Sequence, residues 1–229
     1  MTKERVAKEK KGNGITELVF ILDKSGSMAG MESDTVGGFN SMIDKQKNGE
    51  GEVLVSTVLF SNYSEVLHDR KPLKEIEPLT EKDYFVGGGT ALLDAIGGAI
   101  HHIGNIHKYA RPEDVPEHTI FIITTDGYEN ASMQYGSEKV KKMISRQEKE
   151  FGWEFLFVAA NIDAVDAAER IGIRADRAAC YDVQNDTDLL FAEMSETVCA
   201  FREKGTIRKD WAKKIEAGSK TKTPKKPKK

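Results

Sequence analysis

Cysteine is scarce in this sequence, and the motifs that cysteine usually builds are missing. The chain of 229 residues has two cysteines, Cys180 and Cys199, which stand too far apart for a Cys-x-x-Cys pair. This spacing gives no support to a redox motif or to a zinc motif. We expect both residues to be buried, unpaired thiols, one in a strand and one in a helix.

Long apolar runs are missing as well. No stretch approaches the ~18 consecutive apolar residues that a membrane-spanning helix requires. The first residues are charged and contain no apolar segment of the kind found in secretory signals. These absences predict a cytoplasmic protein that has no membrane-spanning segment.

Acidic residues are missing from the C-terminal end, and the charge is therefore divided unevenly. The last ten residues hold six lysines, and the first twelve carry a net charge of +3. Because the whole chain has a net charge of −3, the residues between them carry −12. An acidic middle does not suit a nucleic-acid-binding domain. The lysine-rich tail is expected to be a solubilising, disordered end. The alternative is weak attachment to nucleic acid or to an acidic partner, driven by counterion release.

Hydrophobic patterning predicts strands that alternate with helices. The expected strands are residues 17–22, 53–60, 65–68, 119–124, 154–159 and 179–183, and the expected helices are residues 34–47, 91–106, 137–151, 164–171 and 187–202. Such alternation predicts an α/β fold with a doubly wound, mostly parallel sheet and helices on both faces. The short turn at residues 61–63 allows only antiparallel pairing, so the strand at 65–68 is expected to form an antiparallel edge.

The same patterning suggests one folded domain between two polar ends. Residues 1–14 are expected to form a flexible N-terminal arm, and residues 15–205 the domain. Residues 206–229 are expected to be a basic, largely disordered tail, in which Trp211 and Ile215 indicate a single amphipathic turn.

Oxygen-bearing side chains follow the first buried strand directly. Asp23, Ser25 and Ser27 come after the apolar run of residues 18–22, at the carboxyl end where open α/β sheets place their ligands. A carboxylate and hydroxyls are hard donors of the type that Mg²⁺ and Mn²⁺ prefer. The same residues could instead cap a helix, because serine and aspartate oxygens also accept hydrogen bonds from free amides.

Two further segments bring oxygen ligands to the same edge of the predicted sheet. Asp126 and Gly127 follow the strand at 119–124, which is expected to lie beside the first strand. Thr90 follows three glycines and precedes a helix. That glycine run lacks the Gly-Lys-Ser/Thr ending of a phosphate-binding loop, which argues against a nucleotide site. Two carboxylates and three hydroxyls around one point would form a small, open cation site.

These residues resemble the metal ion-dependent adhesion site of the von Willebrand factor type A domain family. The five matching positions are Asp23, Ser25, Ser27, Thr90 and Asp126, and their contexts match as well: Asp-Lys-Ser-Gly-Ser-Met at 23–28, Gly-Gly-Thr-Ala-Leu at 88–92 and Thr-Asp-Gly-Tyr-Glu-Asn at 125–130. The first of these contexts resembles the form common among prokaryotic and phage members. The resemblance covers about residues 15–204.

The resemblance implies a non-enzymatic protein-interaction module that holds a divalent cation, Mg²⁺ in the first place and Mn²⁺ or Ca²⁺ as alternatives. Ser25, Ser27 and Thr90 would coordinate the metal directly, while Asp23 and Asp126 would act mainly through water molecules. A protein partner would supply an aspartate or glutamate to the open coordination position. The loop residues expected to lie at the rim and to contact that partner are Lys24, Met28, Met31, Tyr128 and Glu129.

Two other chemistries are compatible with the same residues. A hydrolase or phosphoryl-transfer enzyme could use the cation as a Lewis acid, with Glu129 as its general base. Histidines offer little support for a second metal site, because His101 and His102 are adjacent on the expected helix and cannot face one point. We therefore expect His101 and His102 at solvated or boundary positions. No His-Glu-x-x-His spacing occurs among the histidines, His107 included.

Overall fold

The strands form one six-stranded sheet in the order β3-β2-β1-β4-β5-β6. The computed structural model describes residues 14–160, 163–181 and 187–220. Five of the strands are parallel, and β3 alone pairs antiparallel with its neighbour β2. The strands are β1 (Ile15–Asp23), β2 (Glu52–Phe60), β3 (Ser64–Pro72), β4 (His118–Thr125), β5 (Glu154–Ala160) and β6 (Ala178–Tyr181).

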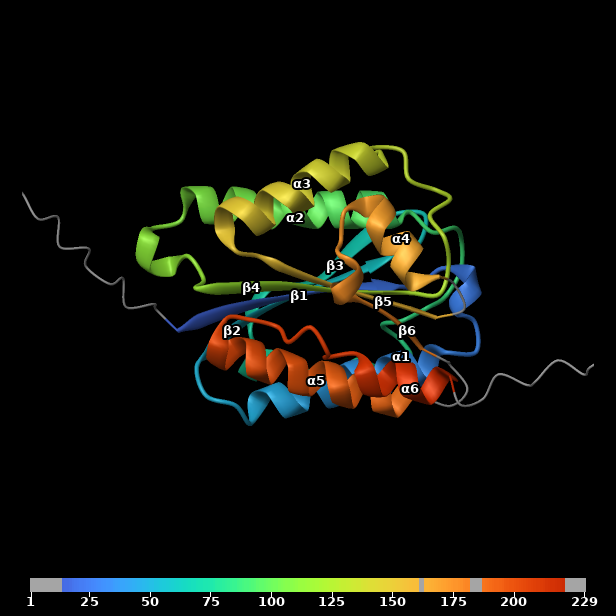
Figure 1. Cartoon of the computed structure of the whole chain (residues 1–229), viewed down its shortest axis with the longest axis horizontal. Coiled ribbons are helices and arrows are strands. Elements are labelled where there is room, and N and C mark those ends of the chain that lie inside the picture. The colour runs from blue at the N-terminus through green and yellow to red at the C-terminus, as the bar shows by residue number, and fades with distance from the viewer. Residues whose placement is uncertain (1–13, 161–162, 182–186, 221–229) are drawn as a thin grey trace, which may run out of the picture.

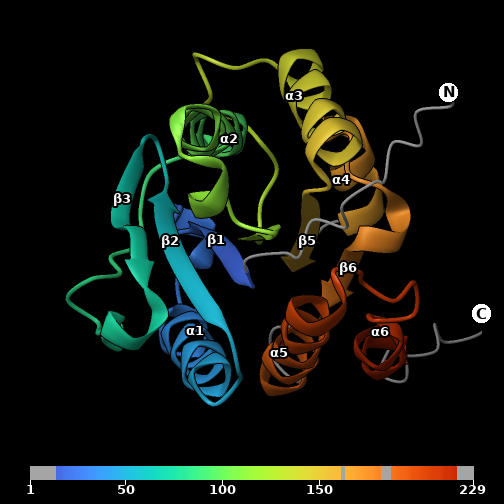
Figure 2. The same cartoon turned by 90° about the vertical axis from the view of Figure 1, so that its left-hand side faces the viewer.

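Helices cover both faces of the sheet (Figure 1). The helices are α1 (Glu32–Lys47), α2 (Leu92–Tyr109), α3 (Ser137–Phe151), α4 (Ala164–Ile171), α5 (Thr187–Lys204) and α6 (Lys213–Lys220). Figure 2 shows α2, α3 and α4 on one side of the strands and α1, α5 and α6 on the other. The predicted doubly wound α/β fold is therefore confirmed, including the antiparallel edge strand.

Strand β1 lies in the middle of the sheet because its side chains are apolar on both faces. Val19 and Ile21 belong to the core under α2, α3 and α4, and the alternate residues Leu18 and Phe20 belong to the core under α1 and α5. A half-exposed strand would show polar residues at every second position, whereas this one is buried from Thr16 onward. The continuous apolar run in the sequence is thus explained by burial on both faces.

The edge strand β3 is longer than expected and mostly polar. It extends from Ser64 to Pro72, whereas the sequence predicted residues 65–68 only. Its register against β2 shifts twice, between Val55 and Thr57 and between Thr57 and Val58. Charged residues and bulges of this kind are common on edge strands, where they hinder pairing with other chains.

The charge at the centre of the sheet is an unexpected feature. The Glu17 side chain on β1 is fully buried, and its carboxylate accepts hydrogen bonds from Arg70 Nε at 2.8 Å and from His107 Nε2 at 2.5 Å. Arg70 has a left-handed backbone (φ 47°), the only such non-glycine residue among those described. The His107 side chain is only 10% exposed, and its role as a partner of Glu17 was not predicted from the sequence.

The folded part of the chain continues past residue 205, where the sequence analysis ended the domain. Ile207, Trp211 and Ile215 are buried in the core that α1 and α5 share. The indole of Trp211 donates a hydrogen bond to the carbonyl of Asp176 at 3.0 Å. The prediction of a largely disordered segment from 206 onward is therefore wrong for this stretch, since α6 packs against β6 and α5. Residues 1–13, which hold most of the predicted arm, and residues 221–229, the lysine-rich end of the predicted tail, lie outside the described residues.

Other expectations were tested at single residues. Asp163 caps α4, because its side chain accepts a hydrogen bond from the amide of Asp166. Cys199 is half-buried, but Cys180 is exposed on β6, so the prediction of two buried thiols is wrong for Cys180. Among the described residues, no helix has both the length and the apolar character needed to cross a membrane.

A half-buried acidic side chain on α3, Glu148, leads to a prediction about stability and pH, although its carboxylate lies 3.5 Å from the Arg174 guanidinium. Burial raises the pKa of Glu148, and one of its carboxylate oxygens has no hydrogen-bond partner among the described residues. A carboxyl group with a raised pKa in the folded protein binds more protons there than in the unfolded chain, so its contribution to the free energy of unfolding falls as the pH rises through that pKa. We expect Glu148→Gln to be more stable than the wild type at pH 7 and equally stable near pH 3.5. Urea unfolding at both pH values measures this, and equal effects at the two would contradict it.

Candidate metal centre

Strand pairing brings the two aspartates of the predicted site to the same edge of the sheet. β1 and β4 are parallel neighbours, and Leu22 pairs with Thr124. Asp23 therefore ends β1 beside the point where β4 passes into Asp126. In Figure 1 this edge lies toward the right, where the short helical turn after β1 is drawn in blue.

The loop after β1 turns its oxygen atoms toward each other. The amide of Ser25 donates to Asp23 Oδ1 at 2.7 Å, and the hydroxyls of Ser25 and Ser27 lie 3.1 Å apart. A single 3₁₀ turn, Gly26–Met28, follows Ser25, and the Ser25 side chain makes no capping hydrogen bond to it. Met31 rather than a serine precedes α1, also without a side-chain cap. The helix-capping alternative therefore does not account for the two serine hydroxyls.

The segment after β4 contributes the second carboxylate and a support for the first. Ser27 Oγ donates to Asp126 Oδ1 at 2.5 Å, which joins the two loops. Thr125 Oγ1 donates to Asp23 Oδ2 at 2.6 Å. Both carboxylate oxygens of Asp23 thus accept hydrogen bonds. Asp126 accepts one through Oδ1, from the Ser27 hydroxyl. The structure brings Asp23, Ser25, Ser27 and Asp126 into one hydrogen-bonded group.

The glycine-rich segment lies against the first loop through its backbone. The amide of Gly26 donates to the carbonyl of Gly88 at 3.0 Å, and the amide of Gly87 donates to the carbonyl of Lys24 at 2.8 Å. Gly88 has a left-handed backbone (φ 83°), which favours glycine. A side chain at Gly89 would come within 2.8 Å of the Asn130 amide oxygen. Glycine is required at 88 by backbone conformation and at 89 by space.

Thr90 completes the group from the start of α2. Its amide donates to Asn130 Oδ1 at 2.9 Å, and its carbonyl accepts from the amide of Asn130 at 3.1 Å. These reciprocal bonds hold Thr90 against the segment after β4. A Cβ atom added to Gly127 would lie 3.2 Å from Ser27 Oγ and 3.4 Å from Thr90 Oγ1. Hydroxyls from two different loops therefore converge on one point beside Asp126.

Burial sets the electrostatics of the two carboxylates. Asp23 is fully buried, and Asp126 is 7% exposed. Burial raises the pKa of Asp23, although hydrogen bonds from Thr125 and Ser25 oppose this effect, and the charge of Asp126 adds to it. Burial also raises the pKa of Asp126, opposed by the hydrogen bond from Ser27. Two partly desolvated carboxylates beside neutral hydroxyls form an environment that a small divalent cation would stabilise.

The donor set passes a test of fit for such a cation. All five side chains offer oxygen, the only donor type that Mg²⁺ favours, and two of them can be negatively charged. The point beside Gly127 on which Ser27 and Thr90 converge is open because residue 127 has no side chain. The centre has only two carboxylates and therefore differs from metal sites built on histidine, cysteine, aspartate or glutamate alone. No group of three or more such residues that could hold a metal occurs in the described part of the chain.

Several supporting residues were not assigned this role from the sequence. Tyr84 is buried, and its hydroxyl donates to the carbonyl of Asp23. Asn62, in the turn after β2, accepts the amide of Gly89 at 2.7 Å. Thr125 and Asn130 stand beside recognised positions, which is the one signal that could have found them. Nothing in the local pattern marks Tyr84 or Asn62, because each acts on a residue far away in the chain.

Glu129 has a structural role that the sequence analysis missed. Its carboxylate accepts hydrogen bonds from the amides of Leu93, Ala131 and Ser132 and from the hydroxyl of Ser132, at 2.7–2.9 Å. In return Asp94 on α2 accepts the amides of residues 133–135 at 2.8–2.9 Å. The N-terminus of α2 and the segment after β4 thus hold each other in place by exchanging acceptors.

The predicted rim residues differ in how far their side chains are exposed to solvent. Tyr128 is half-exposed, as expected for a residue that contacts a partner. Met28 and Met31 are buried, with 2% and 6% exposure, so their prediction as rim contacts is wrong. Lys24 is mostly covered and pairs with Glu65 at 2.6 Å. The residues next to the two methionines, Ser27, Ala29 and Gly30, are exposed, so the methionine side chains alone turn inward from this part of the loop.

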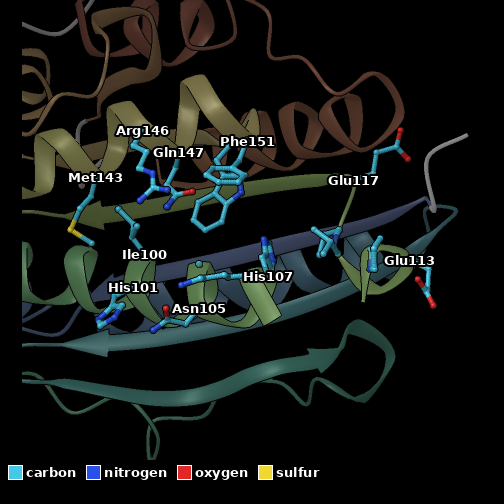
Figure 3. A pocket seen from close by; sticks show the side chains of 16 residues that line it. Ile100, His101, Asn105, His107, Glu113, Glu117, Met143, Arg146, Gln147 and Phe151 are labelled. Atoms are coloured by element: carbon cyan, nitrogen blue, oxygen red, sulfur yellow. The ribbon is translucent and has the colours of Figure 1, made fainter. Parts of the chain in front are cut away.

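A cavity of about 1110 Å³ lies at the other end of the strands (Figure 3). It is lined by α2, α3 and the segment that leads into β4, including Ile100, His107, Gln147 and Trp153. None of the five predicted metal ligands lines it. Its position before β4 separates it from the carboxyl edge, so the cavity and the candidate metal centre are distinct features.

This chain resembles known proteins in its structure and not in its sequence. No family model matches the sequence, and no curated protein matches it. Solved structures with a similar fold include proximal thread matrix protein 1 from the mussel byssus, at 14% identity and a TM-score of 0.56, over 81% of this chain and 46% of that one. The VWA2 protein of Sulfolobus acidocaldarius matches at 21% identity and a TM-score of 0.51, over 80% of this chain and 45% of that one. The chain has the von Willebrand factor type A fold.

A third von Willebrand factor type A match is a structure of the TRAP protein from Plasmodium vivax, at 14% identity and a TM-score of 0.55, over 80% of this chain and 74% of that one. That structure is manganese-loaded, and another structure of the mussel protein has a zinc-occupied metal ion-dependent adhesion site. The chain spans about half the length of the mussel and Sulfolobus proteins. These likenesses establish the fold of this chain.

Gly127 allows a direct test of the proposed metal position. We expect Gly127→Ala to weaken Mg²⁺ binding at least tenfold, because its methyl group would fill the point where the hydroxyls of Ser27 and Thr90 converge. Gly136→Ala is the matched control, since a Cβ there meets nothing within 4 Å. Isothermal titration calorimetry with Mg²⁺ measures both variants. Equal affinities for Gly127→Ala and the wild type would place the metal elsewhere.

Proposed function

We propose that this protein is a non-enzymatic interaction module that binds Mg²⁺ through Asp23, Ser25, Ser27, Thr90 and Asp126 and captures a carboxylate of a protein partner. One observation carries the proposal: hydroxyls from two loops converge over Gly127, beside the buried carboxylate of Asp126. Each loop is held in place by hydrogen bonds to another, so the oxygens are positioned before a ligand arrives. Mn²⁺ and Ca²⁺ are the alternative cations.

The residues have different roles in this proposal. Ser25, Ser27 and Thr90 would hold the metal through neutral hydroxyls, while Asp23 and Asp126 would orient water molecules and those hydroxyls. Thr125 and the amide of Ser25 already occupy both oxygens of Asp23, which suits a supporting role. A bound cation would supply Lewis acidity and positive charge. Because its nearest protein ligands are neutral, much of that charge would be left to attract a partner carboxylate.

An enzymatic role for the same centre has less support. The hydrolase or phosphoryl-transfer alternative needs a general base, and Glu129 was the candidate. Its carboxylate instead accepts four hydrogen bonds that hold the start of α2 and its own loop. A base occupied in this way would have to break those bonds to take a proton. The tail proposed as a nucleic-acid tether lies largely outside the described residues, and the cytoplasmic location and prokaryotic or phage origin stay predictions.

Affinity capture tests the proposed function. The wild-type protein, immobilised, is exposed to a cell extract in Mg²⁺ or in EDTA, and Asp126→Ala is exposed in Mg²⁺. We expect a partner that is retained only by the wild type in Mg²⁺, since the metal bridges the two proteins. The partner is then purified, and each candidate aspartate or glutamate is changed to asparagine or glutamine.

The decisive result is loss of at least tenfold in affinity from one such change in the partner. Small losses of affinity spread evenly over many acidic residues of the partner would indicate nonspecific electrostatic attraction and would contradict the proposal. Retention of the same partner in EDTA would contradict it as well. Glu65→Gln serves as the control in this chain, because Glu65 is exposed beside the site but pairs with Lys24 and holds no metal in the proposal.

A further inference from the structure

Four of the eight large apolar side chains that are exposed in the described structure stand on segments that build the candidate metal centre. They are Tyr63, Phe85, Tyr128 and Met133, with exposures of 79%, 70%, 50% and 94%. We call this set the apolar ring. Large apolar side chains grouped at one end of a protein are typical of an interaction surface, whereas single ones scattered over a surface are not informative.

Each member of the apolar ring stands on a segment that also builds the metal centre. Tyr63 closes the turn whose Asn62 accepts the amide of Gly89. Phe85 stands two residues before Gly87, which is bonded to Lys24 in the first loop. Tyr128 follows Gly127 directly, and the amide of Met133 is held by Asp94. The backbone that carries the ring is therefore hydrogen-bonded to the segments of the metal centre, and the ring's members come from three separate parts of the chain.

Charge around the ring is acidic. The three segments that build the metal centre, residues 24–31, 84–91 and 126–136, contain one basic residue, Lys24, and it pairs with Glu65. Acidic side chains begin the neighbouring helices, with Glu32 and Asp34 on α1 and Asp163 before α4. Within the three segments, a bound cation would thus be the only positive charge that is not already paired with a carboxylate. A second carboxylate beside the first would meet acidic groups and no free lysine or arginine in these segments.

We propose that the partner segment presents a single aspartate or glutamate flanked by apolar side chains, and that acidic stretches are disfavoured. The inference rests on the proposed function, since the metal must hold the central carboxylate. The apolar ring would cover the flanking side chains, whose burial is favourable by roughly 25 cal/mol per Å². The acidic surroundings would select against additional negative charge.

Four short peptides in Mg²⁺ test the inference. Their cores, placed between glycine-serine ends, are Leu-Phe-Glu-Leu, the same with Gln for Glu, Ser-Ser-Glu-Ser, and Asp-Asp-Glu-Asp. Binding is followed by amide chemical shifts of the isotope-labelled protein, a method that detects millimolar affinities. We expect Leu-Phe-Glu-Leu to bind at least tenfold more tightly than the serine and acidic peptides, with shifts at the ring residues, and its glutamine version not to bind.

Variants of the ring give the matched comparison. Tyr63→Ser and Phe85→Ser should each weaken binding of the Leu-Phe-Glu-Leu peptide several-fold and leave the serine peptide unchanged. Tyr109→Ser is the control. Tyr109 is 78% exposed, nearly as much as Tyr63, but it lies at the end of α2 that is farthest from the metal centre.

The outcomes separate this inference from the proposed function. If Mg²⁺ does not bind, or if the glutamine peptide binds as well as the glutamate peptide, the proposed function itself fails. If binding requires both Mg²⁺ and glutamate but the apolar, serine and acidic peptides bind equally, only the inference fails. It also fails if Tyr63→Ser and Tyr109→Ser have the same effect.

Discussion

Mg²⁺ is expected to raise the unfolding temperature of the wild-type protein and to leave that of Asp126→Asn unchanged. A ligand that binds only the folded state at about 100 times its Kd stabilises that state by about 2.7 kcal/mol. For a domain of this size, such stabilisation corresponds to a rise of roughly 5–10 °C. Asparagine can still accept the hydrogen bond from Ser27, so the variant keeps the local geometry and loses the charge that attracts the metal.

The metal-free comparison makes this prediction sharper. Without metal, Asp23 and Asp126 are two buried carboxylates whose charges repel each other, and removing one charge relieves that repulsion. We therefore expect Asp126→Asn in EDTA to unfold at the same temperature as the wild type or higher. A site kept for binding, at the expense of stability, shows this pattern.

Differential scanning fluorimetry with and without Mg²⁺ measures both effects. Asp69→Asn is the control, because Asp69 lies on the edge strand β3, is half-exposed and pairs only with the exposed His102. We expect it to keep the full Mg²⁺-dependent rise. An Asp126→Asn variant that still gains several degrees with Mg²⁺ would show that Asp126 does not contribute to the metal site.

Breaking the buried ion pair of β1 should cause the largest loss of stability. Arg70→Met would leave Glu17 buried with His107 as its only hydrogen-bond partner. Removing one partner of a buried pair typically costs about 3–5 kcal/mol, because the remaining charge is left without compensation. Methionine resembles the arginine stem in length, so lost packing adds little.

A double-mutant cycle separates the pair from its parts. The double variant Glu17→Leu, Arg70→Met replaces both charges by apolar groups, which is often neutral for stability. We expect it to be more stable than Arg70→Met alone, although the left-handed backbone at residue 70 is retained in both. Urea unfolding of the four proteins gives the coupling energy. A loss below about 1 kcal/mol for Arg70→Met would mean that His107 alone compensates Glu17.

The fold could be predicted because its signals are local. Apolar runs such as residues 18–22 are buried on both faces, and helical spacing marks the faces of α2 and α3. The edge strand was predicted because a three-residue turn cannot join parallel strands. The end of the folded chain was not predicted, since Trp211 and Ile215 are two apolar residues in a polar segment. Their burial depends on the packing of that segment against β6 and α5.

The candidate site was predicted in part for the same reason. Asp23, Ser25 and Ser27 are close in sequence, and Asp126 follows a strand that had to lie beside theirs. The buried state of Met28 and Met31 was not foreseen, because a loop position says nothing about which way the loop folds. Glu129 was taken for a possible base, since its hydrogen bonds to Leu93 and the loop arise only when α2 is in place.

The sequence by itself determined the order of strands and helices and which five oxygen-bearing residues stand at the carboxyl edge of the sheet. Both follow from short-range patterns, in which each residue's chemistry and its neighbours suffice. Only the tertiary structure decided that the Ser27 hydroxyl is hydrogen-bonded to Asp126 and does not cap a helix, that Gly127 leaves the point of convergence open, and that the large apolar side chains of the neighbouring segments are exposed. These features depend on contacts between segments up to about a hundred residues apart, whose directions are set by the packing of the whole sheet.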